Sequence, residues 1–521
     1  MKKKIILTVV FIIFVFLRII HLSADAPTAL SWGRGPFTDE GFYAHNARNK
    51  VLFGSWSMDD YNYHFVSPVM GALNFIAFKT MGVKYSSIRL IAVFLSCLTM
   101  FLVFILVRRK YDEDTAVLSG FFMGFTYFSI MYHRLFISEI PMLFFLMLTL
   151  FLLDQGKRRD YFMAGMCFLL SLLAKSLALH FIAVIAWILW RQRQNGLWQK
   201  AGWFFAGAIT IAVAWLIFLV CPDPEKFFSF YRIFISRISP KQLNQVYKVF
   251  NAEYFAYVPV LTTLALVALR WHQSFGYLEK LAGIWLAAGI GFLMLFSYTT
   301  TAYYLILFIP MVILVCGLIY KVRQQALARR PGLFWFNAIW LFSGYFIFRY
   351  IVLFYFRDIF FQSLAAKLAL EIITVVIVAG LWRLSSRLAY YPGRLVVTGT
   401  IILFLVIDFA PYLPWIAAPH YVVKETMSDL QAKIPLGTVA GPWAPTLCLE
   451  TNLREFPFGE AVVNVGRLKE KTSLTHLLLE RREEELGYIQ QNYPFLLVRS
   501  TVVATYFVDN KIIDLWKLSH D

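Results

Sequence analysis

Charged side chains are scarce in this chain. Only 15% of its 521 residues are Asp, Glu, Lys or Arg, whereas 59% are hydrophobic. A soluble domain carries about 25% charged and about 45–50% apolar residues. The shortage of charge therefore excludes an ordinary soluble protein and indicates a polytopic α-helical membrane protein.

Acidic residues are scarcer than basic ones, which leaves a formal net charge of +18. A strongly basic balance can indicate a nucleic-acid partner. Here, however, the Lys and Arg residues lie in short clusters between hydrophobic runs, as they do in the cytoplasmic loops of membrane proteins. We therefore expect no nucleic-acid partner.

Cysteine is rare as well, and the sequence shows no internal repeat and no low-complexity segment. The cysteines have neither the spacing of a metal site nor that of a disulfide framework, and small buried hydrophobes are the expected role. They are Cys97, Cys167, Cys221, Cys316 and Cys448.

The N-terminus resembles a signal peptide, with three lysines, an apolar core and small residues after it. Its apolar stretch, about 5–22, is closer to the roughly 20 residues that span a bilayer than to a signal core of about 7–15 residues. We therefore expect an uncleaved first membrane helix. Whether or not this segment is cleaved, the residues around position 30 lie on the outer side of the membrane.

Hydropathy predicts about thirteen membrane-spanning helices. They lie at 5–22, 88–107, 115–132, 140–154, 161–176, 177–190, 201–220, 254–269, 281–297, 303–320, 333–355, 364–382 and 395–410. With the N-terminus inside, every second loop is basic, as the positive-inside rule requires. A crossing by the apolar run 67–83 would break this pattern, so we expect an interfacial or re-entrant helix there.

Two further features complete the predicted organisation. Residues 23–87 form one long outer loop, and a second, basic outer loop covers about 222–253. After residue 410 the chain becomes more charged, with short β-type runs around one helical stretch. We predict a membrane domain at 1–410 and a small soluble α/β domain at 411–521, on the outer side.

An acidic pair, Asp39-Glu40, lies in the first outer loop, in the segment FTDEGFYAHNARNKVLFG. Acidic residues near hydrocarbon are costly and usually have a function, so we interpret the pair as catalytic. A helix N-cap is the alternative explanation for Asp39. The two interpretations are compatible, because a cap position fixes the carboxylate in place.

Glu139, in YHRLFISEIPMLFF, is predicted on the same membrane face as Asp39. Pro141 suits the first turn of the following helix, so Glu139 is either a helix-start acid or a second site residue. Arg134 either binds a phosphate with two parallel hydrogen bonds or neutralises Glu139.

Lys175 lies between two apolar runs, in LSLLAKSLALHF. It either extends to the membrane interface or binds the phosphate of a lipid. Tyr303 and Tyr304 begin another helix at the outer side and belong either to an interfacial aromatic belt or to the site. Three other charged residues lie inside predicted spans: Arg18, Arg349 and Glu371. Arg349 and Glu371 can pair with each other.

In sequence order, four motifs resemble those of one enzyme family: DEGFYAHNAR, Arg134-x(4)-Glu139, LLAKS and Tyr303-x(6)-Pro310. They resemble the GT-C glycosyltransferases of the protein-O-mannosyltransferase and lipid A aminoarabinose-transferase superfamily. The stretch GPWAPTLCLETN at 441–452 resembles the outer domain of some bacterial members. The resemblance covers most of the chain, and the loop with the acidic pair is its most specific motif.

The resemblance implies a GT-C fold and a polyprenyl-phosphate sugar donor, with inversion at the anomeric carbon. It implies that Asp39 is the base or a metal-site acid and that Lys175 approaches the lipid phosphate. The acid after the outer arginine is usually Asp in the family and is Glu139 here. A lysine often precedes the tyrosine in the aminoarabinose branch, whereas this chain has threonines at 299–301.

The required chemistry fits these residues. An acceptor hydroxyl or amine must lose a proton to a carboxylate, for which Asp39, Glu139 and Glu40 are the candidates. The departing phosphate needs positive charge, from Lys175, Arg134 or a divalent metal. Such a metal, Mg, Mn or Zn, would be shared by Asp39 and Glu139.

We therefore expect a monomeric glycosyltransferase in the plasma (inner) membrane, in contact with membrane lipid. Its site and C-terminal domain face the extracytoplasmic side, and its acceptor is a protein, lipid A or a cell-envelope glycan. The alternative is a transporter or flippase of lipid-linked sugars, for which internal repeats and helices broken at the midplane are typical. The sequence shows neither feature clearly.

Overall fold

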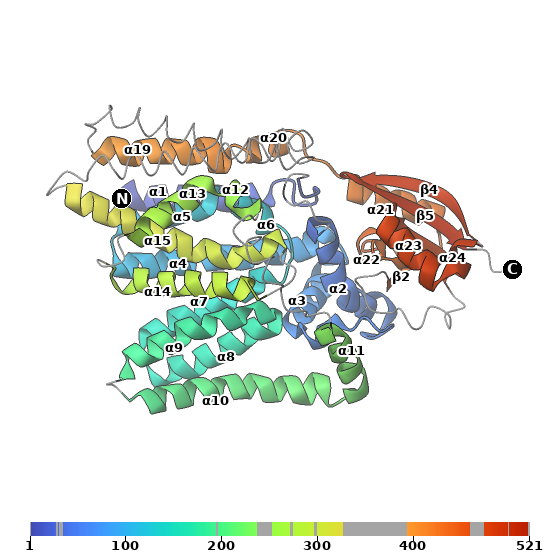
Figure 1. Ribbon diagram of the computed structural model, residues 1–521, viewed down its shortest axis with the longest axis horizontal. Helices are drawn as coiled ribbons and strands as arrows, with labels where there is room; N and C mark the ends of the chain where they lie inside the picture. Colours follow the sequence, from blue (N-terminus) through green and yellow to red (C-terminus); the bar gives the residue numbers. More distant parts are fainter. Residues whose placement is uncertain are drawn as a thin grey trace, which may run out of the picture.

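A bundle of apolar helices fills most of the computed structural model, and a small sheet with its own helices lies at one end (Figure 1). The structure describes residues 2–27, 30, 35–193, 196–236, 253–270, 275–295, 300–326, 393–458, 474–498 and 500–518. The second outer loop, predicted at 222–253, is described only in part.

The long helices of the bundle run side by side along its axis (Figure 1). They are α1 (Lys2–Ile19), α4 (Tyr85–Lys110), α5 (Glu113–Phe125), α7 (Glu139–Gln155), α8 (Arg158–Ala174), α9 (Ile182–Arg191), α10 (Leu197–Trp215), α13 (Pro259–Arg270), α14 (Tyr277–Leu293), α15 (Leu305–Ala326) and α19 (Gly393–Phe404). Short pieces extend or join them: α6 (Tyr127–Tyr132), η3 (Ser176–Phe181), η5 (Leu216–Val220), α12 (Glu253–Tyr257), η8 (Thr301–Tyr304), η9 (Leu405–Phe409) and α20 (Tyr412–Ala417).

Most of the helices predicted from hydropathy coincide with helices of the structure. Those predicted at 333–355 and 364–382, with Arg349 and Glu371, lie outside the described residues. The span predicted at 115–132 is divided at Thr126 into α5 and α6. Within the described ranges, three helices are long and apolar enough to cross a membrane: Tyr85–Lys110, Leu197–Val220 and Thr301–Lys321. The total of thirteen spans stays a prediction.

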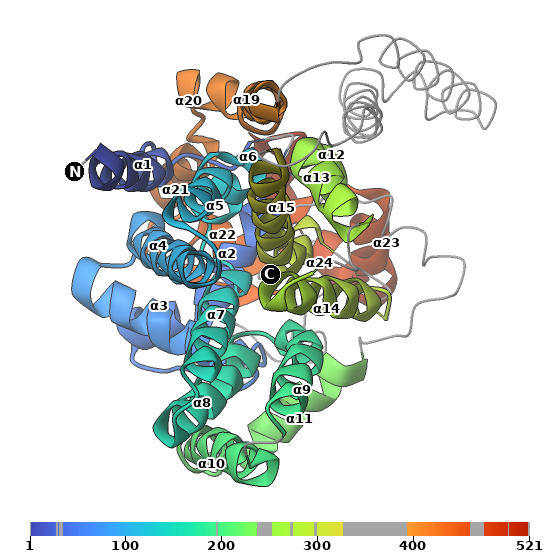
Figure 2. The same ribbon diagram turned by 90° about the vertical axis from the view of Figure 1, so that its left-hand side faces the viewer.

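Helices differ sharply in how much of their surface other helices cover. Figure 2, viewed from the end away from the sheet, shows α15 among its neighbours and α10 at the margin beside α8. Side chains of α15 such as Val312 and Leu314 are fully buried, whereas Phe205 and Ile209 of α10 are largely exposed. An apolar helix with an exposed face is what contact with lipid requires.

The first outer loop forms helices at the same end of the bundle as the sheet (Figure 1). They are α2 (Gly35–Phe53), η2 (Tyr63–Phe65) and α3 (Pro68–Met81). Helix α3 covers most of the run that we expect to be interfacial or re-entrant. Helix α11 (Pro224–Ser236), the described part of the second outer loop, lies at this end too.

The sheet has five strands in the order β2-β1-β3-β5-β4. The strands are β1 (Thr438–Gly441), β2 (Arg454–Pro457), β3 (His476–Glu480), β4 (Ser500–Val508) and β5 (Lys511–Leu518). Strand β1 is parallel to β2 and β3, and β5 is antiparallel to β3 and β4. Its helices are α21 (Val422–Lys433), α22 (Ala444–Leu447), α23 (Glu483–Asn492) and α24 (Pro494–Val498).

Two local features follow directly from the sequence of the sheet. Strands β4 and β5 are joined by the two-residue turn Asp509-Asn510, and Asp509 has the positive φ, +57°, that such turns require. Gly441 has a φ of +138°, and a Cβ there would lie 2.1 Å from the carbonyl oxygen of Leu478. Only glycine permits this approach of β1 to β3.

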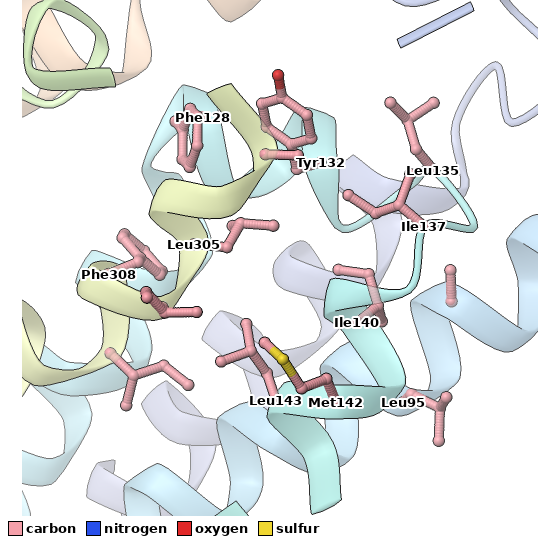
Figure 3. Close-up of a cluster of buried hydrophobic side chains, with 14 of the residues drawn as sticks. Leu95, Phe128, Tyr132, Leu135, Ile137, Ile140, Met142, Leu143, Leu305 and Phe308 are labelled. Carbon is pink, nitrogen blue, oxygen red and sulfur yellow. The ribbon is translucent and has the colours of Figure 1, made fainter. Parts of the chain in front are cut away.

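The segment between α6 and α7 is held by apolar packing. Figure 3 shows Leu135 and Ile137 of this segment gathered with Ile140 of α7 and with Leu305 and Phe308 of α15. All five side chains are at most 3% exposed. Close van der Waals packing of this kind holds neighbouring segments together within a membrane bundle. This packing fixes the start of α7, where Glu139 lies.

Candidate active site

Lys175 and Glu139, which are 36 residues apart, form an ion pair. Glu139 is the first residue of α7, and Lys175 follows the last residue of α8. Helix dipoles favour a carboxylate at an N-terminus and an ammonium at a C-terminus. The side chains of Lys175 and Glu139 are only 10% and 1% exposed, so the pair is largely shielded from water.

An aromatic ring from a third element contacts the same lysine. The Lys175 Nζ lies 4.2 Å from the centroid of the Tyr303 ring, within the range of a cation–π interaction. Tyr303 belongs to η8, at the start of the buried helix α15. The structure therefore brings together three of the residues proposed from the sequence, Glu139, Lys175 and Tyr303.

Two half-buried tyrosines that the sequence analysis missed complete this cluster. Tyr43 of α2 and Tyr63 of η2 have ring centroids 5.2 Å apart. Burial raises the pKa of the Tyr63 hydroxyl, Lys175 opposes this, and Tyr303, Glu139 and Asp39 add to it. Burial raises the pKa of Tyr43 well above its usual value in the same way. Both phenols therefore stay neutral and can donate a hydrogen bond to a substrate oxygen.

Asp39 belongs to the same group of charges. Its carboxylate acts electrostatically on the phenols of Tyr43, Tyr63 and Tyr303, and the residue is half-buried. Helix α2 is formed from Gly35 onward, so the N-cap interpretation of Asp39 is wrong. Tyr43 follows Asp39 by four residues and therefore shares its helix face. That spacing was the signal that could have identified Tyr43.

Glu40, the neighbour of Asp39, is held in a different set of contacts. Its carboxylate accepts hydrogen bonds from Arg89, 3.0 Å from Nε and 2.6 Å from Nη2, and from the backbone N–H of Phe136 at 2.8 Å. Arg89 also donates to the carbonyls of Leu22 and Ala24. Glu40 thus connects α2 to α4 and to the segment before Glu139, which argues against a catalytic role for it.

Two other charged candidates lie in contacts of their own. Arg134 donates to the carbonyls of Ile20 and His21, and its guanidinium lies 4.1 Å from the centroid of the Trp415 ring. Arg18 donates to the carbonyls of Met123 and Gly124 at the end of α5. The structure does not bring either arginine to Lys175.

Tyr304 also lies apart from the cluster. Its ring stacks on that of Tyr254, with centroids 5.4 Å apart, and is fully buried. Successive residues of a helical turn point in different directions, so Tyr303 reaches Lys175 while Tyr304 packs in the bundle. We retain Tyr303 alone as a candidate for contact with the substrate.

The donor set fits a divalent metal poorly. Glu139 is paired with Lys175, and an ammonium group so close to a carboxylate repels a divalent cation. In the described part of the chain, no group of three or more His, Cys, Asp or Glu side chains is arranged as metal ligands. The ion pair with Lys175 thus leaves Glu139 poorly suited to share a divalent metal with Asp39.

Helix α2 is also fixed from the side of the sheet domain. His45 lies between two carboxylates, with Nδ1 2.8 Å from Oε1 of Glu455 and Nε2 2.9 Å from Oδ2 of Asp59. Burial lowers the pKa of His45, but Asp59 and Glu455 outweigh this and raise it to about 9. Arg48 donates to four backbone carbonyls: Cys448, Leu449, Thr451 and Leu453.

Helix α2 also approaches the sheet domain closely at Gly41. A Cβ there would lie 2.6 Å from backbone atoms of Pro445 and Thr446, so only glycine fits. These contacts fall within the stretch 441–452, whose resemblance to outer domains of the family was noted above. The sheet domain therefore helps to position Asp39 and Tyr43.

Comparison with known proteins identifies the fold. Residues 66–220 match the sequence model of the dolichyl-phosphate-mannose-protein mannosyltransferases. The crystal structure of ArnT from Cupriavidus metallidurans bound to undecaprenyl phosphate is similar, with a TM-score of 0.62 and 14% identity over 98% of this chain and 97% of that chain. The chain has the fold of the GT-C glycosyltransferases. The resemblance inferred from the motifs is thereby confirmed.

A second structure of the same ArnT, in the apo state, gives a TM-score of 0.61 at 14% identity, over 98% of this chain and 97% of that chain. No sequence among the curated proteins matches this chain. The mannosyltransferase model and the GT-C fold together indicate a membrane glycosyltransferase. The matched residues 66–220 include Glu139 and Lys175, whereas Asp39 and Tyr43 precede them.

Proposed function

We propose that this chain transfers a sugar from a polyprenyl-phosphate-linked donor to an acceptor on the extracytoplasmic side of the membrane. The observation that carries the proposal is the convergence of Asp39, Glu139, Lys175 and three tyrosines from five separate elements. A carboxylate, an ammonium and neutral phenols are the groups that displacement of a phosphate requires. The similar ArnT structure contains undecaprenyl phosphate, which supports a lipid of this class as donor carrier.

In the proposed reaction, an acceptor oxygen or nitrogen attacks the anomeric carbon of the donor. The bond from that carbon to the phosphate oxygen breaks, and its electron pair leaves with the phosphate. Because the acceptor attacks from the face opposite the phosphate, the configuration inverts. Asp39 takes the proton of the acceptor. Lys175 and the hydroxyls of Tyr43 and Tyr63 stabilise the negative charge that develops on the departing phosphate.

The position of the basic residues supports the proposed sidedness. Helix α4 has three basic residues in its last turn, Arg108 to Lys110, and begins at Tyr85, whose hydroxyl donates to the carbonyl of Thr446 in the sheet domain. Its 26 residues span about 39 Å. The basic end therefore lies a membrane thickness away from the sheet domain, which we place outside by the positive-inside rule.

The acceptor is proposed as a class. It carries a hydroxyl or amine and reaches the site from the extracytoplasmic side, as a protein, lipid A or a cell-envelope glycan does. The sheet domain contacts α2 beside Asp39 and is the described part of the chain best placed to bind such an acceptor.

The test is to incubate the purified protein with a panel of polyprenyl-phosphate sugars and membrane extract as the source of acceptor. We expect release of polyprenyl phosphate, together with transfer of the sugar label to extract. The same incubation without extract is the control. Movement of labelled donor between leaflets without release of polyprenyl phosphate would contradict the proposal and favour a flippase.

A further inference from the structure

Glu139 forms an ion pair with Lys175. Lys175 is the cation that binds the phosphate in the proposed reaction, so the carboxylate already takes up the phosphate site. Among the described ion pairs, Glu139 has a single cationic partner, Lys175, and Lys175 a single acidic one. A buried ammonium without a counterion is strongly destabilising. In the absence of ligand, Lys175 therefore depends on Glu139.

A phosphate that reaches Lys175 must share it with a carboxylate. Two like charges that approach the same ammonium repel each other, and they do so more strongly in a site shielded from water. The side chain of Ser138 offers the displaced carboxylate a partner, because its hydroxyl already lies 3.4 Å from Oε2 of Glu139. The carboxylate can thus give up Lys175 and keep a hydrogen bond.

Charge also changes during the reaction. The donor is a phosphate diester with one negative charge, whereas the released lipid phosphate is a monoester with about −1.5 to −2 at neutral pH. A lysine alone would therefore bind the product more tightly than the donor. A carboxylate that competes for the same lysine reduces this difference and favours product release.

We propose that Glu139 competes with the lipid phosphate for Lys175. Glu139 pairs with Lys175 in the ligand-free protein, is displaced by the phosphate of the donor, and pairs with Lys175 again as the product leaves. The inference rests on the proposed function, because it takes Lys175 as the phosphate site. It gives Glu139 a task different from that of Asp39, which remains the base.

The test is equilibrium binding of undecaprenyl phosphate to the purified full chain, as wild type and as Glu139→Gln. We expect Glu139→Gln to bind about tenfold more tightly, which is about 1.4 kcal/mol. The matched control is Glu425→Gln, on the exposed surface of α21, which should bind like the wild type. Equal or weaker binding by Glu139→Gln would overturn the inference.

Thermal unfolding supplies a second measurement, in case Glu139→Gln is too unstable for titration. That variant leaves Lys175 without its counterion, so it should unfold at a lower temperature than the wild type. Undecaprenyl phosphate should raise its unfolding temperature by more than it raises that of the wild type. A smaller or equal rise would overturn the inference.

Lys175→Met separates this inference from the proposed function. Its matched control is Lys79→Met, on the exposed surface of α3. Wild-type affinity in Lys175→Met would refute the phosphate site itself, and with it the proposed role of Lys175. Weaker binding in Lys175→Met without tighter binding in Glu139→Gln would refute the competition alone.

Discussion

Asp39 and Glu40 are adjacent residues of one helix with different environments. Asp39 acts on the tyrosines of the cluster, whereas Glu40 is fully enclosed by Arg89 and the N–H of Phe136. Adjacent helical residues face different directions, so one acid can serve the reaction while the other fastens the helix. The sequence alone could identify the acidic pair. It could not separate the two roles, because Arg89 is brought to Glu40 only by tertiary packing.

This difference predicts opposite effects on stability. Glu40→Gln removes the carboxylate from a buried arginine and should lower the free energy of unfolding by about 3–5 kcal/mol. Asp39→Asn should leave it nearly unchanged. The measurement is thermal unfolding of the two purified variants beside the wild type. Equal unfolding temperatures for both would contradict the assignment of Glu40 as a structural residue.

His45 predicts a dependence of stability on pH. Its pKa of about 9 in the folded protein lies above the value of about 6.5 in an unfolded chain. The stabilisation is therefore fully present below about pH 6.5 and is lost as the pH rises through about 9. We expect the unfolding temperature of the wild type to fall across this range more steeply than that of His45→Gln. Parallel pH profiles would contradict the assignment.

At the scale of elements, the long apolar runs could be predicted because hydropathy over about 20 residues is a strong signal. The break at Thr126 could not, because it depends on one residue with an extended backbone, φ −73° and ψ 119°, between α5 and α6. Tyr63 was missed for a related reason. It lies on a three-residue helix without periodicity, and only the fold brings it to Tyr43.

Helices α8 and α10 cross at two glycines. A Cβ at Gly165 would lie 1.8 Å from the carbonyl oxygen of Phe204, and one at Gly207 would lie 1.9 Å from that of Phe162. Small residues allow such close packing between membrane helices. Because α10 is otherwise widely exposed, this crossing is its main attachment to the bundle.

Gly165→Ala should therefore destabilise the protein by about 1–3 kcal/mol, since the helices must move apart. The matched control is Gly202→Ala on α10, where a Cβ meets nothing within 4 Å. Thermal unfolding in detergent measures both. Similar unfolding temperatures for the two variants would show that the close crossing is absent in solution.

At the scale of the whole molecule, α2 is held between the helix bundle and the sheet domain. Glu40 fastens it to the bundle through Arg89, and His45 and Arg48 fasten it to the sheet domain. Composition could predict that a charged α/β segment follows residue 410, and the boundary at 410/411 stays a prediction. Composition could not predict that this segment contacts the helix with the acidic motif, because the contacts join residues about 400 positions apart.

The most direct test of this account compares transfer by wild type, Asp39→Asn and the surface control Asp429→Asn, each with saturating polyprenyl-phosphate sugar and extract. A general base contributes about 10²–10⁴-fold to the rate. We predict that Asp39→Asn loses at least about 100-fold in transfer while its binding of undecaprenyl phosphate and its unfolding temperature match those of the wild type. Transfer by Asp39→Asn at the rate of the wild type would contradict the assignment of Asp39 as the base.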